Sequence, residues 1–136
     1  QLADFDKGRP EFASIDVSFI SLNLILPALH KILQDQGEVV ALIKPQFEAG
    51  RDFVGKNGIV KDKQVHQKVI KEVTHFANNF GFEVQGLDFS PIQGGHGNIE
   101  FLMYLVKKTP SQQVEDRQIE ELVEKAHKEF EKHEEK

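Results

Sequence analysis

Apolar positions divide the chain into short segments whose spacing predicts alternating strands and helices. Residues 12–19 and 39–43 are short apolar runs typical of buried strands, and residues 82–89 and 99–107 show the same character. A helix is predicted between the first two strands, and a second helix after Asp62. The apolar positions at helical spacing are Leu22, Ile25, Leu26, Leu29 and Leu33 in the first helix, and Val65, Val69, Val73, Phe76, Ala77 and Phe80 in the second.

Turn-forming residues predict where these helices begin and end. Pro27 is expected to kink the first helix and Gly37 to end it. Asp62 suits the N-cap of the second helix, and Gly81 its end. A polar, glycine-bearing loop, long enough to act as a lid, is expected at residues 45–60.

The order of these elements predicts the fold class. Strand, helix, strand, helix and then two adjoining strands indicate a wound α/β sheet that ends in an antiparallel, hairpin-like pair. Residues 109–136 are rich in charge, and one stripe of this segment is apolar. The favoured interpretation is a helix that docks by the stripe, and the alternative is an interaction tail. The stripe consists of Ile119, Leu122, Val123, Ala126 and Phe130.

Composition narrows the possible functions. The chain has 136 residues, 39% of them hydrophobic, which fits one globular unit. It contains no cysteine, so disulfides and thiolate metal sites are excluded, and its six histidines lack the spacing of metal ligands. We therefore expect no metal site. The apolar runs are too short to cross a bilayer, so we expect a soluble protein that does not act on membranes. The absence of cysteine fits a reducing cytoplasm, where we expect the protein to be.

Charge is distributed unevenly along the chain. The net charge is −5, and residues 111–136 contribute nine acidic and five basic side chains. The remainder is close to neutral, so the totals show no basic face for nucleic acid. Any affinity for RNA must be local or come from another domain.

Three ionisable residues adjoin the apolar strands. The run VVALIK ends in Lys44, Asp16 interrupts the first strand, and Glu100 starts the last one. Ligands bind outside the carboxyl ends of parallel strands, and an antiparallel last strand brings its start to that same edge. The sequence therefore predicts that the three charges meet at one edge. A buried ion network and a functional site explain this pattern about equally well.

The sequence patterns that point to other binding residues are less specific. The loop SPIQGGHGN resembles a phosphate cradle, but its glycines precede a strand, whereas such cradles open a helix. A tight connection is favoured, with His96 as an exposed loop residue. Phe47, Phe53 and Phe89 could stack on a nucleobase, although aromatic residues in an α/β domain usually belong to the core.

Several longer stretches carry a family resemblance. The segments IDVSFISLNLILPAL, ALIKPQFEAGRDFVGKNGIVKD, VHQKVI and GLDFSPIQGGHGNIEFL resemble the TlyA-type proteins, a family also described as haemolysins. These proteins contain an FtsJ-like ribosomal RNA methyltransferase domain. The resemblance covers residues 1–108 and implies the C-terminal half of a Rossmann-like, S-adenosylmethionine-dependent methyltransferase fold. Residues 109–136 would then be an added C-terminal charged helix.

The resemblance also implies an activity and a set of site residues. The activity is methylation of a ribose 2′-hydroxyl in ribosomal RNA with S-adenosylmethionine as cofactor, without a metal. The family's catalytic set is Lys-Asp-Lys-Glu, whose last three members match Asp16, Lys44 and Glu100. Lys44 would take the hydroxyl proton, while the two carboxylates orient it. The residues expected to border the transferred methyl group are Asp16, Val17, Ser18 and Phe19.

The resemblance is incomplete at its N-terminal side. Family members have an upstream S4-like RNA-binding domain, a glycine-rich cofactor loop and a first catalytic lysine, and this chain starts at Gln1 without them. We therefore expect a fragment that is inactive alone and that exposes the edge of strand 12–19, where it could self-associate. Two alternatives remain open: a membrane-active haemolysin, and a non-catalytic module that binds RNA or protein.

Overall fold

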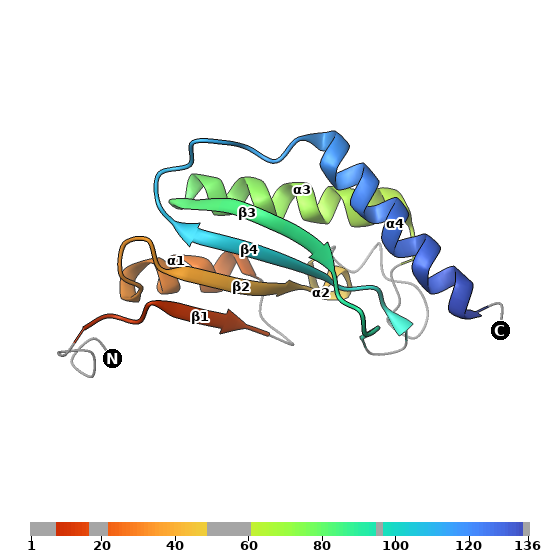
Figure 1. The fold of residues 1–136 in the computed structure, drawn as a ribbon, viewed down its shortest axis with the longest axis horizontal. Coiled ribbons are helices and arrows are strands. Elements are labelled where there is room, and N and C mark those ends of the chain that lie inside the picture. Colours follow the sequence, from red (N-terminus) through yellow and green to blue (C-terminus); the bar gives the residue numbers. More distant parts are fainter. Residues whose placement is uncertain (1–7, 17–21, 49–60, 95–96, 135–136) are drawn as a thin grey trace.

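The structure is a computed structural model that describes residues 8–16, 22–48, 61–94 and 97–134. Within these residues the chain forms a four-stranded sheet accompanied by helices (Figure 1). In chain order the elements are β1 (Phe12–Ile15), α1 (Leu22–Ile32), β2 (Glu38–Ile43), α2 (Pro45–Glu48), α3 (Lys63–Asn79), β3 (Phe82–Phe89), β4 (Phe101–Lys107) and α4 (Asp116–Glu134).

The sheet is mixed and has the strand order β1-β2-β4-β3. Strands β1 and β2 are parallel, as a strand–helix–strand connection requires. Strand β4 lies between β2 and β3 and is antiparallel to both. The predicted α/β arrangement and its final antiparallel pair are therefore confirmed.

Several predicted boundaries were wrong. Strand β1 ends at Ile15, so Asp16 follows the strand instead of interrupting it. Helix α1 ends at Ile32, several residues before Gly37. The loop predicted at 45–60 begins with the short helix α2, and its residues 49–60 lie outside the described part of the chain.

One face of the sheet carries the core. Along β2, buried and half-buried side chains alternate, which is the pattern of a strand with one covered face. In Figure 1, α1 and α3 lie behind the sheet, and these two helices also contact each other. The fully buried side chains that join these layers include Leu26, Leu33, Val39, Ile43, Ile70, Phe82, Phe101, Met103 and Leu105.

The ends of α3 follow the predicted capping chemistry. The Asp62 carboxylate accepts a hydrogen bond from the Gln64 amide at 2.8 Å, which satisfies one of the unpaired donors of the first turn. At the other end Gly81 adopts φ +87, a left-handed conformation that glycine enters without a steric penalty. Both predicted boundaries of this helix are confirmed.

A half-buried lysine links α1 to the sheet. Lys107, the last residue of β4, donates hydrogen bonds to the carbonyl oxygens of His30 at 2.6 Å and Leu33 at 2.8 Å. The last carbonyls of a helix lack intrahelical partners and carry partial negative charge, so an ammonium there is favourable. This contact fixes the far end of α1 relative to β4.

The segment between β4 and α4 is held by Glu83, at the start of β3. Its carboxylate accepts hydrogen bonds from the Ser111 hydroxyl at 2.6 Å and amide at 2.9 Å, and from Gln85 Nε2 at 2.9 Å. These bonds, above all that from the Ser111 hydroxyl, lower the pKa of Glu83 to about 2. The carboxylate therefore remains ionised and keeps the segment attached to the sheet at neutral pH.

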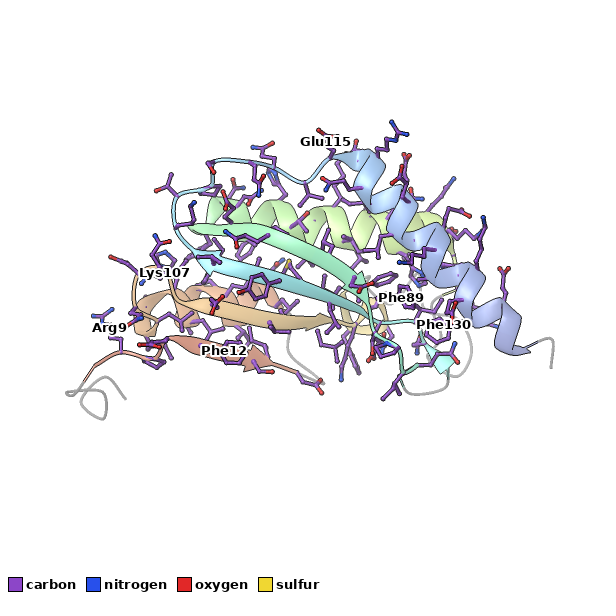
Figure 2. The ribbon with its side chains drawn as sticks, in the orientation of Figure 1. Arg9, Phe12, Phe89, Lys107, Glu115 and Phe130 are labelled. Carbon is purple, nitrogen blue, oxygen red and sulfur yellow. The ribbon has the colours of Figure 1, made fainter. Side chains whose placement is uncertain are left out.

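The C-terminal helix docks on the domain, as the favoured interpretation predicted. Helix α4 packs against α3 and β3, and four of its five stripe residues are buried while Leu122 is half-buried. Near the end of β3, the rings of Phe89 and Phe130 meet edge to face with centroids 5.9 Å apart (Figure 2). The apolar stripe is thus part of the core.

A buried histidine pair also joins α3 to α4. His66 Nδ1 and His127 Nε2 are 2.8 Å apart, so one nitrogen donates and the other accepts, and the His66 ring also meets Phe101 edge to face. Burial, followed by the positive charge of Lys63, lowers the pKa of His127. The charged groups that influence His127 are Lys63, Glu131, Glu124 and Asp62.

Among the residues that the structure describes, no helix is both long and apolar enough to cross a bilayer.

We predict that the histidine pair makes stability depend on pH. The pKa of folded His127 lies below its ordinary value near 6.5. The contribution of His127 to the free energy of unfolding is therefore fully present above that value and declines as the pH falls below it. His127→Gln keeps a donor and an acceptor but does not titrate. Urea unfolding between pH 7.5 and 5.5 should show a smaller loss for this variant, by at most about 1.4 kcal/mol per pH unit.

The exposed His75 supplies the control for this measurement. His75→Gln should lose stability with pH as steeply as the wild-type chain. Equal losses in the wild type and in His127→Gln would contradict the prediction.

Candidate active site

Strand register brings the three predicted site residues to one edge of the sheet. The last recorded pair of the β2–β4 ladder is Ile43 with Phe101, so Lys44 leaves β2 beside the point where Glu100 enters β4. On the other side of β2, Ile15 pairs with Ala41, and Asp16 follows directly. The expected convergence at the carboxyl end of β2 is therefore observed.

Lys44 and Asp16 form an ion pair. Lys44 Nζ lies 2.7 Å from Asp16 Oδ1, and the lysine side chain is 14% exposed whereas the aspartate side chain is 64% exposed. The ammonium is thus largely withdrawn from solvent while its carboxylate partner stays accessible. The pair lies where the strands end, and its exposed carboxylate faces solvent at this edge of the sheet.

Glu100 is buried beside the pair and has a different partner. Its Oε2 accepts a hydrogen bond from Gln46 Nε2 at 2.7 Å, and only 6% of the residue is exposed. The structure records no direct ion pair between Lys44 and Glu100, although it describes both residues. The carboxylate also lies against Gly94, where a Cβ would come within 2.4 Å of its Cδ.

Gln46 is the site residue that sequence reasoning missed. It lies in α2, two positions after Lys44, in a segment predicted to be loop. Its Nε2 donates a hydrogen bond to Glu100, while its buried Oε1 has no hydrogen-bond partner in the structure. A glutamine in a polar stretch gives no periodic signal, so only the short helix reveals its orientation.

Phe47, the next residue of α2, flanks the lysine. Lys44 Nζ lies 5.9 Å from the centre of the Phe47 ring, and the residue is 41% exposed. Phe89, by contrast, is half-buried against α4. The other sequence candidates, Val17, Ser18, Phe19, Phe53 and His96, lie outside the described residues.

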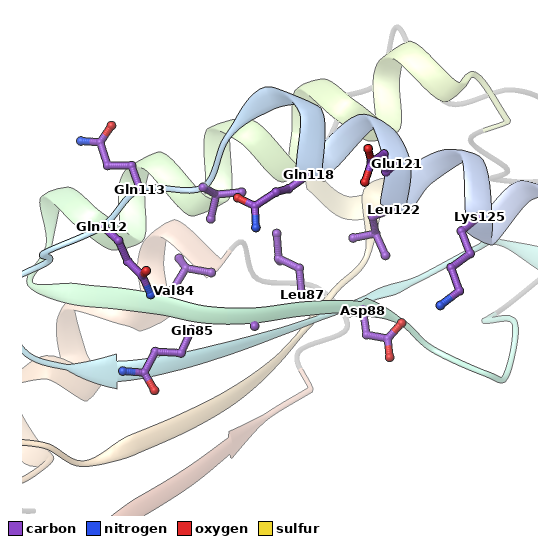
Figure 3. Close-up of a pocket in the computed structure, with 12 residues that line it drawn as sticks. Val84, Gln85, Leu87, Asp88, Gln112, Gln113, Gln118, Glu121, Leu122 and Lys125 are labelled. Carbon is purple, nitrogen blue, oxygen red and sulfur yellow. The ribbon is translucent and has the colours of Figure 1, made fainter.

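A sizeable cavity occurs elsewhere in the fold. It has a volume of about 460 Å³ and lies between β3, the segment before α4 and α4 itself (Figure 3). Several glutamine side chains line it, among them Gln85 and Gln118, and the predicted site residues are not among its lining. In the described part of the chain, no group of three potential metal-binding side chains was found.

The chemistry available at the sheet edge follows from these contacts. It offers a shielded amine held by a carboxylate, a second buried carboxylate held by an amide, and an exposed aromatic ring. Once Lys44 has given up its own proton, its Nζ can receive another, and Asp16 balances the resulting positive charge. These features define a candidate proton-transfer site at the carboxyl end of the central strands.

Comparison with known proteins assigns the family. The sequence matches the family model described as FtsJ-like methyltransferase over residues 1–107. The chain belongs to the FtsJ-like methyltransferase family, and its relatives include proteins named TlyA and hemolysin A.

Individual relatives agree with this assignment. The chain is 53% identical over 129 residues to the "Putative rRNA methyltransferase YqxC" of Bacillus subtilis, covering 93% of this chain and 46% of that protein. It is 37% identical over 102 residues to the "16S/23S rRNA (cytidine-2′-O)-methyltransferase TlyA" of Mycobacterium tuberculosis, covering 75% and 38%. The chain thus spans about half the length of the first of these relatives and less of the second.

A solved structure has the same fold. The "Putative hemolysin from Streptococcus thermophilus" matches with a TM-score of 0.93 and 62% sequence identity, over 100% of this chain and 49% of that one.

We predict that Gln46 stabilises the buried Glu100 carboxylate. Gln46→Leu removes the donor but keeps a similar volume, so it should lower the free energy of unfolding by about 1–3 kcal/mol. Gln113→Leu, at an exposed position, should change it little. Urea unfolding of the purified variants measures both effects.

A double variant separates this hydrogen bond from packing. Replacing both partners by apolar residues leaves no unpaired carboxylate, so Gln46→Leu with Glu100→Leu should be more stable than the sum of the single changes implies. Strict additivity would show that the two side chains do not interact.

Proposed function

We propose that this chain supplies catalytic residues to an S-adenosylmethionine-dependent ribosomal RNA 2′-O-ribose methyltransferase. The observation that carries the proposal is the Lys44–Asp16 ion pair at the carboxyl end of β2, next to the buried Glu100. The named activity of the TlyA relatives supports the choice of reaction and substrate. Because the chain spans about half the length of its relatives, the activity is proposed for the full-length protein.

Lys44 is proposed as the general base. In its unprotonated form, its Nζ accepts the proton of the ribose 2′-hydroxyl while the hydroxyl oxygen forms a bond to the methyl carbon. The positive charge that appears on Lys44 is balanced by Asp16, already 2.7 Å away. Asp16 thus orients the side chain before the reaction and stabilises the charge that forms during it.

Glu100 is proposed to maintain a negative potential beside Lys44. Its carboxylate lies next to the lysine at the end of the β2–β4 ladder, and Gln46 holds one of its oxygens. In this shielded position, the charge acts on Lys44 more strongly than it would in water. Gln46 therefore positions Glu100 without itself meeting the substrate.

The residues present fit a cationic methyl donor. S-adenosylmethionine, when bound, supplies a sulfonium-linked methyl group, and the carbon–sulfur bond breaks as the new carbon–oxygen bond forms. Asp16 is an exposed carboxylate at the end of β1, so it can face a positive charge at the place where the resemblance puts the methyl group. Val17, Ser18 and Phe19 continue from it and are proposed to border the cofactor.

The fold supports the same assignment. A parallel pair of strands followed by an inserted antiparallel strand is the arrangement expected if the chain forms the C-terminal half of a Rossmann-like methyltransferase sheet. Ligands of such sheets bind at the carboxyl ends of the parallel strands. Asp16 and Lys44 both occupy that position.

Methyl transfer by a full-length protein containing this chain tests the proposal. Transfer of labelled methyl groups from S-adenosylmethionine to ribosomal RNA should fall by about 10²- to 10⁴-fold in Lys44→Ala, the range expected for loss of a general base. Lys71→Ala is the matched control, because Lys71 also forms an ion pair, with Asp116 at 3.3 Å, away from the site. That control should retain its activity.

The melting temperature of each variant must be measured alongside transfer. A Lys44→Ala protein that is folded and fully active would refute the role of Lys44. Modification of a base instead of a ribose, shown by mass spectrometry of the product nucleosides, would refute the reaction type.

A further inference from the structure

We infer that Phe47 is the surface on which the base of the target nucleotide stacks. The inference rests on the proposed function and adds to it the group that binds the nucleotide. Five large apolar side chains in the described part of the chain are exposed: Phe12, Leu24, Phe47, Phe80 and Ile92. Isolated exposed apolar residues are common, so exposure alone carries no argument.

Position distinguishes Phe47 from the other four. Its ring centre lies 5.9 Å from Lys44 Nζ, the atom proposed to receive the hydroxyl proton. Within α2, Pro45 is buried and Gln46 points to Glu100, so these two residues hold the helix against the domain. Phe47 is then presented outward beside the lysine, with 41% of its surface exposed.

The spacing suits a single nucleotide. The 2′-hydroxyl and the base belong to the same nucleoside, so the group that binds the base must lie within one nucleoside's length of the group that takes the proton. Phe47 and Lys44 meet that condition because they are in contact range of each other. Unstacked bases of single-stranded RNA bind to aromatic side chains in this way.

Stacking on an aromatic ring contributes to the affinity for RNA but does not discriminate between nucleobases. Every nucleobase has a flat π-face, so stacking tolerates all four, and its contribution is orientation of the ribose toward Lys44. Recognition of a particular nucleotide is then left to hydrogen bonds made elsewhere. A bare leucine could fill the same volume but would lack the flat face.

The adenine of the cofactor is another base that could stack there, but the topology favours the RNA. Helix α2 packs against α3, whereas Asp16, the carboxylate proposed to face the cofactor, follows directly after β1 at the edge of the sheet. Figure 1 shows β1 at the outer edge of the sheet, with α2 beyond the end of β2. The two ligands would thus approach Lys44 from different sides.

Steady-state kinetics of the full-length protein test the inference. Phe47→Leu should raise KM for RNA by about 5- to 150-fold, the cost of one stacked base, and leave KM for S-adenosylmethionine unchanged. Phe47→Trp preserves a flat ring and should remain close to the wild type. Phe80→Leu is the matched control, because Phe80 is also aromatic and 39% exposed but lies at the end of α3.

A binding measurement provides a readout that does not need catalysis. The chain contains no tryptophan, so Phe47→Trp introduces a reporter at this single position of the chain. Its fluorescence should be quenched by a single-stranded RNA oligonucleotide to a greater extent than that of Phe80→Trp. Stacking of a base on the indole is the cause of the expected quenching.

The outcomes separate this inference from the proposed function. If the wild type transfers methyl groups and Phe47→Leu has an unchanged KM for RNA, the inference is wrong and the proposed function stands. A raised KM for S-adenosylmethionine in its place would assign the ring to the cofactor and overturn the inference. If the wild type transfers no methyl groups to RNA, the proposed function is wrong. Equal quenching of the Phe47→Trp and Phe80→Trp variants by RNA would overturn the inference as well.

Discussion

The antiparallel register between β2 and β4 is the constraint on which the candidate site depends. Lys44 and Glu100 are far apart in sequence, yet each adjoins the last recorded pair of this ladder, Ile43 with Phe101. A shift of one residue would turn the core side chains of either strand outward, so burial of Ile43 and Phe101 locks the register. The position of the charged side chains is therefore set by the hydrophobic core beneath them.

Much of this arrangement could be predicted, because periodicity and chain order determine it. The apolar spacing identified helices α1, α3 and α4 and the four strands of the described residues, and Asp62 and Gly81 marked the ends of α3. The end of α1 was misplaced because a helix can stop before its glycine, with Gln36 taking the left-handed conformation instead. Gln46 could not be predicted, since its importance comes from a contact with Glu100 that no local pattern encodes.

Helix α4 extends the core of the domain beyond the segment that defines the family. The family match ends at residue 107, but the buried stripe of α4 joins the same hydrophobic cluster as α3 and β3. Glu83 fastens the intervening segment through Ser111, and the His66–His127 contact fastens the helix itself. Apolar contacts alone do not specify an orientation. The two polar contacts therefore determine how the apolar stripe of α4 is oriented on the domain.

Gly94 shows how closely the backbone surrounds the candidate site. The space that a side chain would need at this position is filled by the carboxylate of Glu100, with its Cδ 2.4 Å from where a Cβ would be. Even an alanine would displace that carboxylate, so one methyl group on an uncharged residue would disturb the Gln46–Glu100 hydrogen bond while every ionisable residue remained in place. The geometry of the buried carboxylate therefore depends on a position that carries no side chain at all.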